Sequence, residues 1–132
     1  MEQGKIIVLD KQIYEVHQEM NEVTYEASIA EKNFAIYLIF SDPEQKIKTT
    51  IKIKDNIVYV KRQGSINTNL EFREGFCYNT SYPTGFGNMD ISVVTKRIEM
   101  TRELSHFQLK LYYELWMQQA KISDNIYSIK RI

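Results

Sequence analysis

The sequence has little cysteine, no excess of charge of either sign and no long apolar run. Its one cysteine, Cys77, cannot form an internal disulfide, which is typical of proteins in a reducing compartment. Seventeen basic residues balance 17 acidic residues. This neutrality argues against a dedicated nucleic-acid-binding protein, because phosphate contacts usually require a basic excess.

The longest apolar run is FAIYLIF at residues 34–40, far short of the roughly 20 residues that a membrane-spanning helix requires. No apolar region followed by a small-residue cleavage site occurs near the N-terminus, so no secretory signal is predicted. Hydrophobic residues make up 43% of the chain, which is enough for a packed core. We therefore expect one cytoplasmic domain over residues 1–132, with no membrane partner.

Apolar and polar residues alternate with a period of two, which is typical of half-buried β-strands. The clearest case is residues 46–64, where Asp55 and Asn56 separate two alternating runs. Both residues tolerate positive φ, so we predict a type I′ turn and a β-hairpin. This turn fixes the register, and it places Thr49 opposite Arg62 on the inner face of the hairpin.

Similar alternation predicts further strands at residues 5–17, 23–30, 34–40, 66–73, 76–82, 89–100 and 122–132. We expect a bulge near residues 96–97 and a turn or bulge at residues 123–125. Residues 102–120 are ambiguous, since their composition favours helix. Six apolar or aromatic residues at strict period two between Phe107 and Met117 favour a strand instead.

About eight to ten short strands with little helix predict an all-β fold, either a sandwich or a barrel. The short turns favour a single antiparallel, mostly up-and-down β-barrel, whose closure would remove exposed sheet edges.

Several features between residues 46 and 132 occur in a recognisable order. KRQG ends a strand with Arg62 and Gly64, the next strand is closed by Gly75, and YPTGFG forms a corner. VVTKRI ends a strand in threonine, LKLYYEL carries tyrosine, and a final strand follows Asn125. In this order and spacing the segment resembles the YwiB-like family of uncharacterised bacterial proteins, while the first 45 residues resemble it only in strand rhythm. The resemblance implies a calycin-like β-barrel, the broad architecture of lipocalins and fatty-acid-binding proteins, and no particular activity.

Arg62 is the main candidate for a ligand-binding residue, because a charge on an inner face must be paired or must meet a ligand. Its planar guanidinium suits a carboxylate or phosphate. The alternative is a structural arginine at the barrel rim that pairs with a nearby acid. Thr49, Thr95 and Tyr113 are candidates for the polar lining of an interior cavity. Their alternative role is hydrogen bonding to backbone groups in a filled core.

The segment YPTGFG, residues 82–87, is glycine-rich but is not a phosphate-binding loop, since no lysine followed by serine or threonine completes it. We interpret it as a corner between two strands, with Tyr82 and Phe86 packed on the core and with Gly85 and Gly87 permitting the positive φ or close backbone approach that a sharp corner needs. Thr84 is then a candidate ligand contact at the barrel mouth.

Two histidines, His17 and His106, and Cys77 form no metal-binding or catalytic motif. We therefore expect no metal, no cofactor and no enzymatic activity. The leading hypothesis is a barrel that binds a small, partly apolar or anionic ligand in its interior. The alternative is a protein-interaction module that uses its outer strand faces, where Tyr112 and Trp116 would support a homodimer or another protein partner.

Overall fold

The computed structural model describes residues 1–132, except for the side chain of Thr84. Ten β-strands account for nearly all of the chain, and one short 3-10 helix, η1 (Leu104–His106), precedes the ninth strand. The strands are β1 (Glu2–Ile13), β2 (Gln18–Lys32), β3 (Ala35–Asp42), β4 (Ile47–Lys54), β5 (Ile57–Gly64), β6 (Thr68–Phe72), β7 (Cys77–Thr84), β8 (Gly87–Thr101), β9 (Gln108–Met117) and β10 (Ala120–Arg131). The predicted all-β fold is confirmed.

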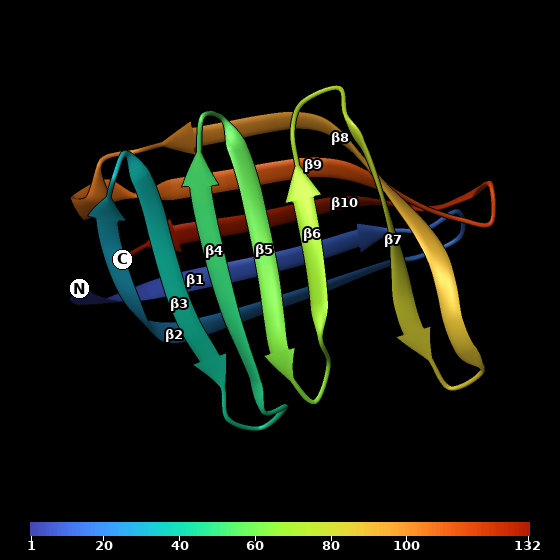
Figure 1. Cartoon of the computed structure of the whole chain (residues 1–132), viewed down its shortest axis with the longest axis horizontal. Helices are drawn as coiled ribbons and strands as arrows, with labels where there is room; N and C mark the ends of the chain where they lie inside the picture. The colour runs from blue at the N-terminus through green and yellow to red at the C-terminus, as the bar shows by residue number, and fades with distance from the viewer.

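All ten strands belong to one antiparallel sheet that curls into a nearly closed barrel (Figure 1). Strands β1 to β6 pair in chain order, β7 to β10 do the same, and β1 pairs with β10. The up-and-down prediction is therefore confirmed. The two edges of the sheet are β6 and β7, which are consecutive in the chain but are not hydrogen-bonded to each other. We call this boundary the seam.

The predicted central hairpin is confirmed in both its turn and its register. Asp55 and Asn56 have φ angles of 52° and 64°, as a type I′ turn requires. Thr49 pairs with Arg62 as expected. The turns between β2 and β3 and between β9 and β10 also place two successive non-glycine residues at positive φ, namely residues 33–34 and 118–119.

The ambiguous segment at residues 102–120 is mainly strand, because β9 occupies Gln108–Met117. The predicted bulge near residues 96–97 is confirmed by a register shift between Thr95 and Arg97. The bulge in the last strand lies between Lys121 and Ser123, just before the predicted position. The three turn-forming residues at 123–125 instead remain paired with β9, so their local preference yields to the sheet ladder.

The YPTGFG segment is a corner between strands, as predicted. Thr84 pairs with Gly87 across the β7–β8 hairpin, and Gly87 has a φ of 105°. Tyr82 lines the barrel interior. The expected packing of Phe86 on the core is wrong, because its side chain is fully exposed. Phe86 lies in the two-residue connection itself, outside the paired strands.

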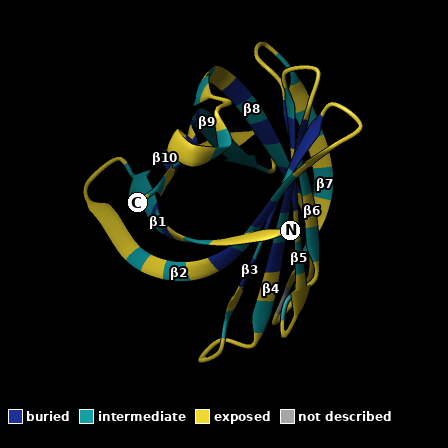
Figure 2. Ribbon diagram, turned by 90° about the vertical axis from the view of Figure 1, so that its left-hand side faces the viewer, coloured by how far each residue is buried: buried dark blue, intermediate teal, exposed yellow. Residues whose placement is uncertain are grey.

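The barrel interior has an apolar half and a polar half. The inward-facing residues of β1 change along the strand from Ile6 and Val8 to Asp10, and those of β5 change from Val58 to Arg62. Ile53 of β4, which pairs with Val58, lies at the same end, although aliphatic side chains of other strands, such as Val23 and Ile91, also line the polar half. Figure 2 shows the buried stretches within the strands and the exposed hairpin turns. The hydrophobic core therefore fills only one end of the barrel.

The apolar end is closed by η1 and by the residue that follows it, Phe107. The Phe107 side chain is completely buried, and its carbonyl oxygen accepts a hydrogen bond from the Arg131 backbone at 2.9 Å. The Arg131 side chain donates to the Leu104 carbonyl at 2.8 Å and forms an ion pair with Glu2. Both chain termini lie at this end (Figure 1).

Candidate ligand-binding cavity

The polar half of the barrel encloses a cavity of about 420 Å³. Its wall combines aliphatic side chains such as Val23 and Ile91 with polar side chains contributed by most of the strands. A cavity of this volume with a mixed lining is typical of small-molecule binding sites. This half of the interior is therefore hollow, which the residues alone did not distinguish from a filled core.

Arg62 lies in the middle of a row of three polar residues on one wall. In the sheet register it pairs with Thr49 of β4 on one side and with Thr68 of β6 on the other, and all three residues line the cavity. The Thr68 Oγ1 atom is buried and has no hydrogen-bond partner among the side chains that the structure describes. The row therefore presents a guanidinium and two hydroxyl groups from adjacent strands, in an arrangement suited to an oxyanion.

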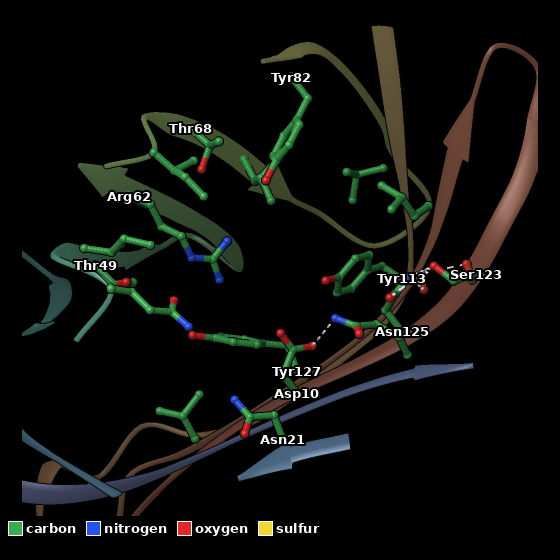
Figure 3. Close-up of a pocket in the computed structure, with 18 of the residues that line it drawn as sticks. Asp10, Asn21, Thr49, Arg62, Thr68, Tyr82, Tyr113, Ser123, Asn125 and Tyr127 are labelled. Carbon is green, nitrogen blue, oxygen red and sulfur yellow. Dashed lines mark hydrogen bonds between the residues drawn. The ribbon is translucent and has the colours of Figure 1, made fainter. Parts of the chain in front are cut away.

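The Arg62 guanidinium has no acidic partner among the described side chains within the 4.0 Å of an ion pair. It lies over the ring of Tyr127, with Cζ 5.7 Å from the ring centroid, and points into the cavity (Figure 3). This arrangement does not support the alternative role of Arg62, a structural arginine that pairs with an acid at the barrel rim. The Tyr127 hydroxyl is a hydrogen-bond partner of the guanidinium, and a carboxylate or phosphate would bind the planar fork of its remaining donors.

Asp10 projects into the same cavity from β1, where it pairs in register with Tyr127 of β10. Its carboxylate accepts one side-chain hydrogen bond, from Gln12 at 3.3 Å. Burial raises the pKa of Asp10 above its ordinary value of 3.8, and the positive charge of Arg62 partly opposes this rise. Burial, reinforced by the nearby Asp10 charge, also raises the pKa of Tyr113, so its hydroxyl stays neutral.

The other acid in the cavity, Asp42, has a structural role. Its Oδ1 atom accepts hydrogen bonds from the backbone nitrogens of Glu44 and Gln45 at 3.0 and 3.1 Å, which fixes the turn after β3. Its Oδ2 atom accepts a hydrogen bond from the Tyr25 hydroxyl at 3.2 Å. Burial and this bond raise the pKa of Tyr25 to about 12. Both oxygens of Asp42 are therefore engaged within the protein.

Three of the predicted site residues, Arg62, Thr49 and Tyr113, are brought together in this cavity. Thr95 is buried and faces inward, but it lies outside the cavity lining. The backbone of Thr95 instead bonds to Gly75 and Phe76 and ties the β6–β7 connection to β8. The side chain of Thr84 lies outside what the structure describes. The ligand-binding role of these residues stays a prediction.

Sequence reasoning missed Asp10, Thr68 and Tyr127 as members of the site. Asp10 continues the alternating inner face that begins with Ile6 and Val8. Extending this alternation along the strand would have predicted that Asp10 faces the barrel interior. Tyr127 faces inward by the same alternation on β10. What the alternation cannot show is that β1, β5 and β10 place these residues around one cavity.

The aromatic pair expected on the outer face is partly covered by charged neighbours. The Arg97 guanidinium lies over the Tyr112 ring, 4.2 Å from its centroid. The Trp116 Nε1 atom donates to the Glu114 carboxylate at 3.1 Å. Both rings are half-buried in the chain itself, and their predicted role in a homodimer stays a prediction.

Asp10→Asn tests whether Asp10 is a buried acid with a raised pKa. A raised pKa means that the folded protein holds a proton which the unfolded chain has already released. Wild-type stability therefore falls as the pH rises from about 4 through the folded pKa, whereas the asparagine variant lacks this loss. We expect the stability of the variant relative to wild type to increase with pH in urea unfolding between about pH 4 and pH 8. A difference independent of pH would contradict the raised pKa.

The chain matches a known protein family over almost its whole length. Residues 6–129 match the family described as "Domain of unknown function (DUF1934)". This chain belongs to the DUF1934 family. The match begins and ends at buried core residues of β1 and β10, Ile6 and Ile129. It therefore spans every cavity residue considered above.

Two comparisons relate this DUF1934 chain to YwiB of Bacillus subtilis. The "Uncharacterized beta-barrel protein YwiB" of Bacillus subtilis (strain 168) is 24% identical over 86 residues, which cover 64% of this chain and 61% of that protein. The alignment thus spans about three fifths of the relative. The "Crystal structure of ywiB protein from Bacillus subtilis" matches with a TM-score of 0.75 and 21% identity over 98% of this chain and 93% of that one. The resemblance and the β-barrel fold predicted from the sequence are confirmed.

The described part of this DUF1934 chain offers no helix with the length and apolarity needed to cross a bilayer. Among the described residues, no cluster of three or more histidine, cysteine, aspartate or glutamate side chains is placed to hold a metal ion.

Proposed function

We propose that this chain is a non-enzymatic, calycin-like binding protein whose interior holds a small, partly apolar anion. The observation that carries the proposal is the Arg62 guanidinium, which faces the cavity between two threonines and forms no ion pair with any described acid. The ligand's carboxylate or phosphate would bind this row, and its apolar part would contact the aliphatic and aromatic wall. The exposed free thiol of Cys77 fits the reducing conditions of the cytoplasm, where we place this function.

The barrel wall holds the Arg62 side chain half-buried. Withdrawing a guanidinium from bulk water without a partner is unfavourable. A bound oxyanion would supply that partner through two parallel charge-assisted hydrogen bonds, and Thr68 Oγ1 would gain a partner that it lacks in the protein alone. The hydrophobic core at the opposite end supplies stability independently of the site, so the polar half need not be filled with protein side chains.

The proposal is tested with two probes that differ in one group, 3-phenylpropanoate and 3-phenyl-1-propanol. We expect the anion to bind the wild-type protein about tenfold or more tightly than the alcohol, as a charge-assisted contact implies. Arg62→Gln should abolish this preference. Isothermal titration calorimetry gives the affinities, and amide chemical shifts should show that the signals of β4, β5 and β6 respond to the anion.

Lys61→Gln is the matched control, because it removes one positive charge at the adjacent, exposed position. This variant should retain the preference for the anion. Failure of both probes to bind, equal affinities in wild type, or an equal effect of the two substitutions would each contradict the proposal.

A further inference from the structure

Two side chains of opposite charge face the cavity without forming an ion pair. Asp10 of β1 and Arg62 of β5 both point into the cavity beside Tyr127 (Figure 3), yet no contact within 4.0 Å joins the carboxylate to the guanidinium. Buried or partly buried charges are normally paired or bind a ligand. Here both charges remain available to the same bound molecule.

Asp10 is the cavity acid that a ligand can use. Both oxygens of the Asp42 carboxylate are engaged, by the Tyr25 hydroxyl and two backbone nitrogens, whereas Asp10 accepts a single long side-chain bond from Gln12. The neighbouring amide of Asn125 is also engaged, since it donates to Ser123 and to the Tyr113 carbonyl. Asp10 is therefore the strongest free acceptor on its wall.

A ligand carrying only a negative charge satisfies Arg62 but leaves Asp10 without a ligand contact. Bound at Arg62, it would bring a second negative charge towards Asp10, whose ionised form is already disfavoured by burial, and like charges would oppose each other. The other titratable groups that act on Asp10 from the packed strands are the neutral phenols of Tyr113 and Tyr127, which offer no compensating positive charge. A ligand with a positive or N–H group directed at Asp10 would remove this conflict.

We infer that the ligand is amphoteric, with an anionic group at the Arg62 row and an amine or other N–H donor at Asp10, as in a small amino acid or a related zwitterion. This inference rests on the proposed function, since it assigns the second polar contact of the same site. Such a ligand gives each of the two charges a partner and leaves the occupied cavity electrically balanced. The aromatic side chains of the wall, including Tyr25 and Tyr82, would contact its apolar part.

The test compares three probes with one apolar body: phenylalanine, 3-phenylpropanoate and phenethylamine. Near neutral pH, wild-type protein should bind phenylalanine about tenfold or more tightly than either single-charge probe, as one added charge-assisted contact implies. Asp10→Asn should remove this advantage by weakening phenylalanine and leaving 3-phenylpropanoate unchanged or tighter. Asp90→Asn, at an exposed position of β8, is the matched control and should behave as wild type.

The outcomes separate this inference from the proposed function. If 3-phenylpropanoate binds wild type as tightly as phenylalanine, or if Asp10→Asn weakens both acids equally, the amphoteric assignment is wrong and the anion-binding function stands. If phenethylamine binds best, or if neither acid binds, the proposed function fails and the inference fails with it.

Discussion

Gly64→Ala should destabilise the barrel by about 3 kcal/mol or more, a large effect for the addition of one methyl group. Gly64 has a φ of 130°, and a Cβ atom at this position would overlap the carbonyl oxygen of Lys46. That oxygen cannot easily withdraw, because it accepts a hydrogen bond from Ser65 at 3.2 Å. The alanine variant must therefore separate the ends of β4 and β5, two residues beyond Arg62. Urea unfolding followed by circular dichroism measures the loss.

Gly75→Ala separates backbone strain from steric overlap. Gly75 also has a positive φ, 74°, but a Cβ atom there would meet nothing within 4 Å. We expect a cost of about 1 kcal/mol, which is the ordinary cost of a left-handed conformation for an alanine. Equal losses for the two variants would show that the close approach of Gly64 to Lys46 contributes nothing.

Phe107→Ala should cost about 3–5 kcal/mol, the usual range when a fully buried aromatic side chain is truncated. Phe107 is completely buried at the closed end of the barrel, and its removal leaves a cavity that the surrounding β-strands cannot fill by local movement. The affinity for 3-phenylpropanoate should remain within about twofold of wild type, because additivity is expected for distant sites. The free energy of unfolding and the binding isotherm are measured on the same variant.

Phe34→Ala makes the same substitution in the exposed turn between β2 and β3, where the side chain is 92% accessible. This control should change stability by no more than about 0.5 kcal/mol. A large loss of ligand affinity in a folded Phe107→Ala protein would refute the division of the barrel into a stabilising half and a binding half.

The fold was predictable where local chemistry and alternation agree. Asp55 and Asn56 accept positive φ readily, so the central hairpin and its register followed from the residues alone. The turns at residues 33–34 and 118–119 have the same backbone signature, but phenylalanine and glutamine are unusual at positive φ. The pairing of the flanking strands imposes those turns. The position of the seam could not be predicted, since it depends on how a long sheet closes on itself.

The candidate site was predictable only for residues whose place follows from a local register. The hairpin placed Arg62 inside and opposite Thr49, and the structure confirms this pairing. Asp10 and Tyr127 meet Arg62 because the first and last strands pair and the sheet curls around, which no local pattern encodes. For Thr95 the alternation was enough to predict that the side chain faces inward. It could not predict whether Thr95 lines the cavity, because that depends on the position of the residue along the barrel axis.

The pairing of β1 with β10 determines when the barrel can close during synthesis. Among the ten strands β1 is synthesised first and its partner β10 last, so the barrel cannot be completed until all ten strands have been made. The chain ends are close together, since the Ile132 backbone nitrogen donates to the Lys5 carbonyl at 2.9 Å. Joining these ends and opening the chain at the seam would give the order β7 to β10 followed by β1 to β6. Every strand would then pair with its immediate neighbour in the chain, and such local pairing favours rapid folding. The order of the strands along the chain thus makes long-range closure a requirement that the barrel geometry itself does not impose.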